Sequence, residues 1–245
     1  MGVINMGMFI IIFLGSAVSL FGTMLGASLG VLIQKPSNKL LGAIIGFAGG
    51  VMMAVVVFDL IPEALEGWSF WGTIVFCIIG ILTVMLMDNV FDLDKYFGNR
   101  HLKAAAITAL GLMMHNFPEG LIMGCGFMSG TGLGIKMSLV IAIHDVPEGI
   151  AVSAPLMVSK VKVSKILLYS AFTALPTALG VGIGAYIGGI SKNVLGGCLA
   201  FTSGVMLYVV CREMLPESSK LWDGVTSTIG ILAGILGGLI ITTVL

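Results

Sequence analysis

Charged residues are scarce in this chain. Only 10% of its 245 residues are charged, whereas a soluble domain carries about 25%. Hydrophobic residues make up 58% of the chain, and they form stretches of about 20 residues with almost no charge. Such stretches are typical of membrane-spanning helices and are too long for the core of a soluble protein. The formal net charge is zero, so the composition suggests no nucleic-acid partner.

The chain also lacks paired cysteines. Cys77, Cys125, Cys198 and Cys211 are scattered and include no C-x-x-C pair, so neither a disulfide framework nor a zinc ribbon is indicated. Small buried hydrophobic side chains are the simplest interpretation of these four residues. Lys and Arg are absent from the first 34 residues, so we expect no cleavable signal peptide. The apolar run from Met6 to Ile33 is instead expected to be the first span.

The hydrophobic pattern predicts a polytopic all-α membrane protein with one transmembrane domain, residues 1–245. We expect eight spans, over roughly 6–33, 40–63, 70–88, 104–127, 133–157, 165–188, 194–216 and 224–244. The connections between these spans are too short to hold a second domain.

The basic residues predict how the chain is oriented. Ten basic residues lie on one side, in the connections after the odd-numbered spans or at the end of the seventh span. They are Lys35, Lys39, Lys95, Arg100, Lys103, Lys160, Lys162, Lys165, Arg212 and Lys220. The opposite side has only Lys136 and Lys192. The positive-inside rule therefore places the odd-numbered connections in the cytoplasm. Both termini then lie outside, as an even number of spans requires.

A segment of the second span recurs in the seventh. Residues Gly50–Glu63 match residues Gly204–Glu217 at a constant offset of 154, and each copy ends in an acid, two apolar residues, Pro and Glu. The two spans cross in opposite directions, as the fourth and fifth do. This order predicts a 3+2+3 inverted repeat. Such repeats are typical of transporters, in which substrate binds near the midplane and one repeat moves against the other.

One short motif occurs twice, as HNFPEG at residues 115–120 and HDVPEG at residues 144–149. Residues three and four apart share a helix face, so each copy places an imidazole and a carboxylate on one stripe. Two facing stripes would offer one cation six candidate ligands: His115, Asn116, Glu119, His144, Asp145 and Glu148. Imidazole suits zinc and related transition metals, whereas Mg²⁺ and Ca²⁺ prefer oxygen ligands. The motif therefore predicts an intramembrane metal site.

The prolines of the motif are expected to kink their helices. Pro118 cannot donate a hydrogen bond to the carbonyl of Met114, nor can Pro147 donate to that of Ile143. A carbonyl freed within a membrane must face protein, water or an ion. Each kink would therefore supply one more oxygen acceptor near the carboxylate.

Acids in the middle of a membrane are costly. At about 2.5–3.5 kcal/mol each, Glu119, Asp145 and Glu148 together cost roughly 8–10 kcal/mol if nothing compensates them. These spans place no Lys or Arg near the three acids, so a divalent cation or protonation must compensate. Protonated carboxyls that bond to neighbouring helices are therefore the alternative to a metal site.

An intramembrane protease is the alternative from a different class. The zinc type requires H-E-x-x-H, which the sequence lacks. A serine type would pair Ser129 with His144, but Ser129 falls at the expected end of the fourth span. We therefore do not expect an enzyme.

With these motifs, the chain resembles the ZIP (Zrt/Irt-like) family of divalent-metal transporters, prokaryotic type. That family has eight spans, outward termini, and H-N-x-P-E-G and H-x-x-P-E-G on its fourth and fifth spans. The resemblance implies a multi-pass protein of the cell membrane that moves Zn²⁺, with Fe²⁺, Mn²⁺ and Cd²⁺ as further candidates, into the cytoplasm. A channel-like pore with the same ligands is the alternative. The expected partners are divalent metal ions and the lipid bilayer, with a homodimer as an option.

The resemblance also implies a binuclear site. The transported metal would be held by His115, Glu119, His144 and Glu148. The two glutamates would bridge to a second position that Asn116 and Asp145 complete.

The sixth span departs from the family pattern at that second position. Many prokaryotic relatives supply a glutamate there, but residues 174–180 contain no acid and Thr177 is the best match. Met53, on the second span, is a further auxiliary candidate. We therefore expect one strong zinc position and at best one weak one.

Other acidic residues are candidates for the two ends of a metal path. Asp59 and Glu63, at the outer end of the second span, could attract cations from outside. Asp88, Glu213 and Glu217, near the cytoplasmic side, could receive the metal on release. Solvated helix ends or salt bridges are the alternative for these acids.

Overall fold

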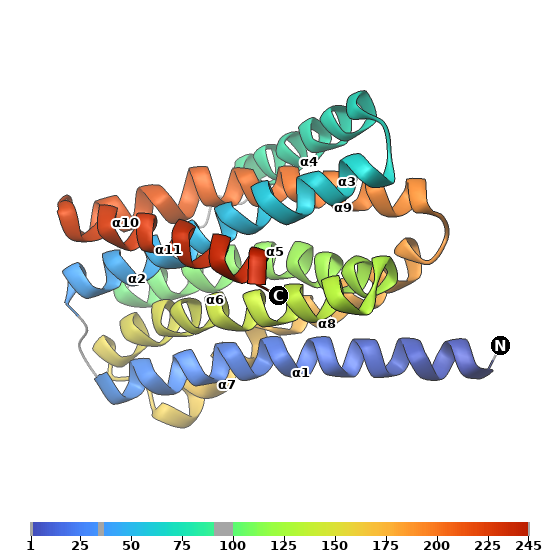
Figure 1. The fold of residues 1–245 in the computed structure, drawn as a ribbon. Helices are drawn as coiled ribbons and strands as arrows, with labels where there is room; N and C mark the ends of the chain where they lie inside the picture. Colours follow the sequence, from blue (N-terminus) through green and yellow to red (C-terminus); the bar gives the residue numbers. More distant parts are fainter. Residues whose placement is uncertain (1, 34–36, 91–99, 245) are drawn as a thin grey trace.

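The computed structural model describes residues 2–33, 37–90 and 100–244, and its helices run roughly alongside one another (Figure 1). The helical elements are α1 (Gly2–Ile33), α2 (Asn38–Val55), η1 (Val56–Leu60), α3 (Ile61–Gly67), α4 (Phe70–Val90), α5 (Arg100–Ser129), α6 (Thr131–Val158), α7 (Val163–Thr173), α8 (Leu175–Gly188), α9 (Lys192–Val209), η3 (Val210–Met214), α10 (Leu215–Leu221) and α11 (Val225–Val244). The described residues contain no strand. The all-α prediction is confirmed for this part of the chain.

The helices follow the expected spans to within a few residues, but the sixth span is divided. α7 ends at Thr173 and α8 starts at Leu175, a break that the hydrophobic pattern does not reveal. Pro176 cannot donate a hydrogen bond to the carbonyl of Phe172, so one continuous helix is disfavoured. Pro176 instead lies in the first turn of α8, where a missing N–H costs nothing.

Many of these helices could cross a membrane. Within the described residues, five are long and apolar enough: Phe9–Ile33, Asn38–Gly67, Val163–Gly188, Lys192–Leu221 and Val225–Val244. α4 contributes a shorter apolar helix, Phe70–Leu86. Large hydrophobic side chains such as Phe9, Trp71 and Tyr186 are exposed on the outside of the molecule. An apolar surface of this extent suits lipid and is unusual in a soluble monomer.

The helices form two bundles that pack side by side. α1, α5, α6, α7 and α8 form what we call the motif bundle, because α5 and α6 carry the two copies of the motif. α2, α3, α4, α9, α10 and α11, with η1 and η3, form the flanking bundle, which lies above it in Figure 1. The two bundles meet where α5 and α8 pack against α9, and where α2 packs against α6.

Glycine allows very close contact within four helix pairs, which we call the glycine seams. A Cβ added at Gly26, Gly120, Gly204 or Gly234 would lie only 2.0 to 2.1 Å from a backbone oxygen of the facing helix. The pairs are α1–α6, α5–α8, α4–α9 and α2–α11. Because lipid provides no hydrophobic force between helices, such close packing is a main source of their stability. Every seam joins one of the first four predicted spans to one of the last four.

The repeated segment contains the same unusual turn in both copies. η1 and η3 are π-helical, and their bounds differ by the 154 residues that separate the two copies. Pro62 and Pro216 follow shortly after these turns. Because proline has no N–H to donate, the helix widens before it, and such π-helical turns are frequent at functional sites. Asp59 and Glu213 occupy equivalent positions in the two turns.

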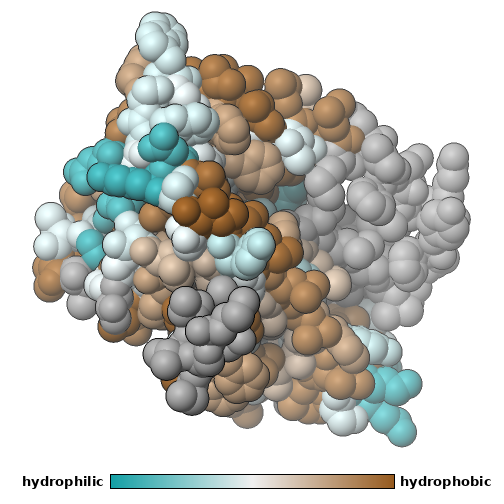
Figure 2. Space-filling view, turned by 90° about the vertical axis from the view of Figure 1, so that its right-hand side faces the viewer, coloured by the Kyte–Doolittle hydropathy of each residue, from teal (hydrophilic) through white to brown (hydrophobic). Residues whose placement is uncertain are grey.

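Figure 2 shows the end of the molecule where α1 begins and α8 connects to α9. Hydrophilic residues gather in separate patches on this face, and hydrophobic residues lie between them. Exposed polar residues near the helix ends here include Glu66, Ser69 and Lys192. This pattern agrees with apolar helices whose polar ends meet water.

Candidate metal site

Both copies of the motif lie in the motif bundle, residues 115–120 on α5 and residues 144–149 on α6, and these two helices pack together. The side chains of His115 and His144 lie outside the described part of the structure. The exposed fractions of the other four candidate ligands are 1%, 0%, 0% and 4% for Asn116, Glu119, Asp145 and Glu148. Three carboxyl groups and one amide are therefore buried in one bundle.

The described side chains alone do not form a metal cluster. Among them, no three His, Cys, Asp or Glu residues gather closely enough to hold an ion. Both motif histidines fall outside that set, so the six-ligand site stays a prediction that the structure does not test.

The two motif helices are continuous through their prolines. α5 and α6 continue as α-helices through Pro118 and Pro147, and the π-helical turns precede Pro62 and Pro216 instead. Glycine seams with α8 and α1 hold the motif helices on either side of their prolines. The kinks expected at Pro118 and Pro147 stay a prediction.

A hydroxyl group on α1 holds Asp145. Ser19 Oγ donates a hydrogen bond to Asp145 Oδ2 at 2.7 Å and lies 3.4 Å from Thr177 Oγ1 on α8. All three residues are 0% exposed. Three helices thus bring oxygen-bearing side chains together. The predicted auxiliary residue Thr177 is linked to Asp145 through the hydroxyl of Ser19.

The break between α7 and α8 orients Asn116. Its Nδ2 donates to the carbonyl of Thr173, the last residue of α7, at 2.7 Å. Carbonyls at a helix end need partners from outside the helix, and here a side chain provides one. Within the described residues, Asn116 Oδ1 is buried and has no hydrogen-bond donor. This amide oxygen therefore keeps its capacity to accept, which a metal ligand requires.

Ser19 and Thr173 were missed by the sequence analysis. A Cβ added at Gly22, three residues after Ser19, would lie 2.9 Å from the Cβ of Asp145. Gly22, Gly26 and Gly30 recur every four residues in the first span and mark the face that brings Ser19 to α6, so this spacing could have revealed Ser19. Thr173 left no such signal, because its contact uses the backbone carbonyl at an unpredicted helix break.

The two acids expected at the outer end of the second span contact the motif bundle. Asp59 Oδ1 lies 3.4 Å from Lys136 Nζ on α6, and Lys136 also donates to the carbonyl of Thr242 at 2.7 Å. Glu63 accepts a hydrogen bond from Ser129 Oγ at the end of α5. Both acids thus make contacts across the boundary between the bundles. The ion pair between Asp59 and Lys136 agrees with the salt-bridge alternative for Asp59.

The remaining candidates are spread along the flanking bundle. Glu213 is partly buried in η3, and Glu217 is exposed on α10. Asp88 lies on α4, but its side chain is outside the described part. Met53 is partly buried and packs against the hydrophobic core. In this structure Met53 therefore has a packing contact, and a role as an auxiliary ligand stays a prediction.

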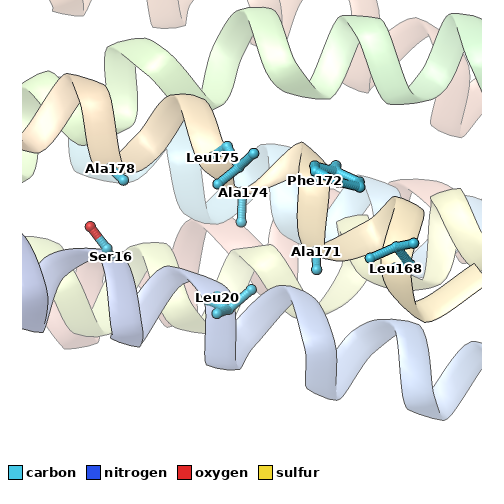
Figure 3. A pocket seen from close by; sticks show the side chains of 8 residues that line it. All are labelled: Ser16, Leu20, Leu168, Ala171, Phe172, Ala174, Leu175 and Ala178. Carbon is cyan, nitrogen blue, oxygen red and sulfur yellow. The ribbon is translucent and has the colours of Figure 1, made fainter.

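A pocket of about 210 Å³ lies between α1 and the α7–α8 break, and its walls are almost entirely apolar. Figure 3 shows Leu20 on α1 facing the stretch that carries Ala171 and Ala174. The Ser16 hydroxyl, also in the wall, donates to the carbonyl of Ile12 at 2.6 Å. This pocket offers a metal ion no suitable set of ligands.

The profile of the family described as "ZIP Zinc transporter" matches residues 94–242, which include both copies of the motif. The chain is 29% identical to the zinc transporter ZupT of Escherichia coli O7:K1 (strain IAI39 / ExPEC), over 235 residues that cover 86% of this chain and 88% of the relative. Zinc transporter ZupT of Escherichia coli O1:K1 / APEC has the same identity and coverage.

The profile match spans more than half of the chain, from 94 to 242 of its 245 residues. The family is one of transporters and not of enzymes. The apolar helices agree with a multi-pass protein of the cell membrane. The chain therefore belongs to the ZIP family of zinc transporters.

Proposed function

We propose that this chain carries divalent metal ions, zinc foremost, across the membrane and into the cytoplasm. The ion would bind between α5 and α6, with the motif histidines and glutamates as its main ligands. The observation that carries this proposal is the burial of Asn116, Glu119, Asp145 and Glu148 in one bundle of a membrane protein. Fe²⁺, Mn²⁺ and Cd²⁺ are further candidate substrates, because imidazole and carboxylate ligands accept them as well.

Zinc uptake by the purified chain in lipid vesicles tests this function. A zinc-sensitive dye inside the vesicles should report uptake that saturates with zinc concentration, because a carrier has a limited number of sites. Vesicles without protein, and competition by each further metal, are the controls. Uptake no faster than in protein-free vesicles would contradict the function, and uptake that rises linearly with zinc would favour the channel-like pore.

We propose an arrangement of eight spans with both termini outside. In Figure 1, α6 meets α7 and α10 meets α11 at one end of the molecule, whereas α8 meets α9 at the other end. Lys160, Lys162, Lys165 and Lys220 lie at or beside the first two connections, and Lys192 lies beside the third. On this arrangement Asp59 and Glu63 face the outside. Asp88, Glu213 and Glu217 lie toward the cytoplasm, where they would receive the ion.

We further propose that the motif bundle moves against the flanking bundle. Motion of spans 1–3 against spans 6–8 would separate the α4–α9 and α2–α11 seams, because each of these joins the two repeats. Motion of the bundles would keep every seam intact and change only the contacts between them. The rigid unit is therefore expected to be a bundle and not a repeat.

Replacing Ser19 with alanine should weaken the second metal position. This change removes the hydroxyl that orients Asp145, and loss of such a supporting group costs about 10- to 100-fold in affinity. Calorimetric titration of the wild type should resolve one tight zinc and at best one weak zinc, and Ser19→Ala should affect only the weak one.

The matched control for Ser19 is Ser16→Ala on the same helix. The Ser16 hydroxyl bonds to its own backbone at Ile12, so both affinities should stay unchanged. Two equally tight zinc ions in the wild type, or equal effects of the two substitutions, would argue against the weak second position.

Replacing Lys136 with methionine should strengthen the attraction of cations to the outer acids. Asp59 would lose its cationic partner, and the local charge would become more negative. The KM for zinc uptake should fall a few-fold at low salt, and this effect should fade near 1 M salt, where the screening length is about 3 Å. Lys136→Arg keeps the charge and should leave KM unchanged; an equal shift with arginine would refute the electrostatic explanation.

A further inference from the structure

Two cysteines face each other across the boundary between the bundles. Cys125 lies on α5 of the motif bundle and Cys198 on α9 of the flanking bundle, and their Sγ atoms are 2.9 Å apart. A disulfide bond needs about 2.05 Å, so the sulfurs are within about 0.9 Å of bonding distance. Cys125 is six residues beyond Glu119, about 9 Å along the helix, and is no part of the proposed metal site.

The two thiols differ in access. Cys125 is 0% exposed, and its Sγ also lies 3.4 Å from the carbonyl of Gly184 on α8. Cys198 is partly exposed. Both sulfurs lie near the same end of the molecule, because Cys125 is four residues before the end of α5 and Cys198 is six residues after the start of α9. An oxidant from water would therefore reach Cys198 first.

We propose that Cys125 and Cys198 form a reversible disulfide that ties the two bundles together and stops transport. The oxidant would be a small disulfide from the aqueous phase. The part of this proposal that concerns transport rests on the proposed function and on motion between the bundles. The bond itself depends on neither.

The bond would form by two thiol–disulfide exchanges. The Cys198 thiolate attacks one sulfur of the oxidant, the oxidant's S–S bond breaks, and one small thiolate leaves. The Cys125 thiolate then attacks the Cys198 sulfur of this mixed disulfide and releases the second small thiolate. Two protein thiols are oxidised and one small disulfide is reduced to two thiols, with the protons passing to water or to the departing thiolates.

The bond would join helices that the proposed transport cycle must separate. α5 carries the Glu119 half of the candidate site, and α9 belongs to a seam with α4 that stays intact in the cycle. A covalent link between them would hold the bundles in the arrangement seen here. Reduction would restore motion, so the pair would act as a redox-controlled lock.

The test uses the full-length chain with Cys77→Ser and Cys211→Ser, which retains only the facing pair. Treatment with 4,4′-dithiodipyridine, a small disulfide, should produce an intramolecular disulfide, seen as the loss of two hydrogens in the intact mass. Zinc uptake in vesicles should then fall at least tenfold, and dithiothreitol should restore it. The two single variants Cys125→Ser and Cys198→Ser, each otherwise with the wild-type sequence, should show no such bond. Both should keep their zinc uptake after the same treatment.

Several results would overturn the proposal. Thiopyridyl adducts on both cysteines without a disulfide would show that the pair does not close. A disulfide with unchanged uptake would show that the bond does not restrict transport. Absence of zinc uptake in the reduced protein would instead refute the proposed function, and the mass measurement would still decide whether the bond forms. Equal uptake by the reduced variants checks that each has folded.

Discussion

Zinc uptake is expected to fall at least about 100-fold when Glu119 is replaced with alanine. Glu119 is 0% exposed in the motif bundle, and we propose that it bridges the two metal positions. Loss of a group that merely supports a metal ligand costs about 10- to 100-fold, so loss of a bridging ligand should cost at least as much. Uptake into vesicles should approach the rate of protein-free vesicles for every metal that the wild type carries.

The variant Glu119→Gln separates a metal ligand from a neutral carboxyl. Glutamine keeps the size and hydrogen-bonding capacity of a protonated glutamate but cannot become an anion. A metal site should lose its function with glutamine as it does with alanine. Full uptake by Glu119→Gln would instead support protonated carboxyls that bond to neighbouring helices. Glu66→Ala, which changes an exposed acid of α3, is the control and should transport normally.

The substitution Gly26→Ala should strongly destabilise the protein. A Cβ at this position would lie 2.0 Å from the oxygen, 2.7 Å from the carbonyl carbon and 2.9 Å from the Cα of Val146. These are backbone atoms that cannot rotate away, so α1 must move off α6. Overpacking of a well-packed contact costs about 1–3 kcal/mol or more. The midpoint of thermal unfolding in detergent should therefore drop by several degrees, and zinc uptake should fall because α1 positions Ser19 against Asp145.

Gly132→Ala on α6 is the matched control, because an added Cβ there would meet nothing within 4 Å. Alanine is the better helix former by about 1 kcal/mol, so this variant should be as stable as the wild type or slightly more stable. Equal midpoints for the wild type and Gly26→Ala would mean that the α1–α6 seam does not need its glycine.

Most helix ranges could be predicted from the sequence, because length and hydrophobicity are local properties. The break at Pro176 and the π-helical turns before Pro62 and Pro216 could not. Proline at any of these positions removes one hydrogen bond, but the neighbouring helices decide whether the chain breaks, widens or continues as it does at Pro118. Tertiary packing therefore determines whether a helix breaks, widens or continues at a proline, and the sequence around each proline does not indicate which of these occurs.

The burial of the candidate ligands was predictable from the motif, but their supporting contacts were not. Helical spacing predicts that Asn116 and Glu119 share a face, and both are buried. The bonds from Ser19 to Asp145 and from Asn116 to Thr173 depend on which helices are neighbours, which spacing within one helix does not determine. The same holds for the pairing of Asp59 with Lys136, residues 77 positions apart.

The glycine seams have a consequence for biosynthesis. α2 can find its close neighbour only after α11 has been made, and α4 must wait for α9. The first spans to enter the membrane therefore stay without their final partners until the ribosome has nearly finished the chain. A truncated N-terminal half would hold one helix of each of the four seams in lipid without its partner, and it should be a target for membrane quality control.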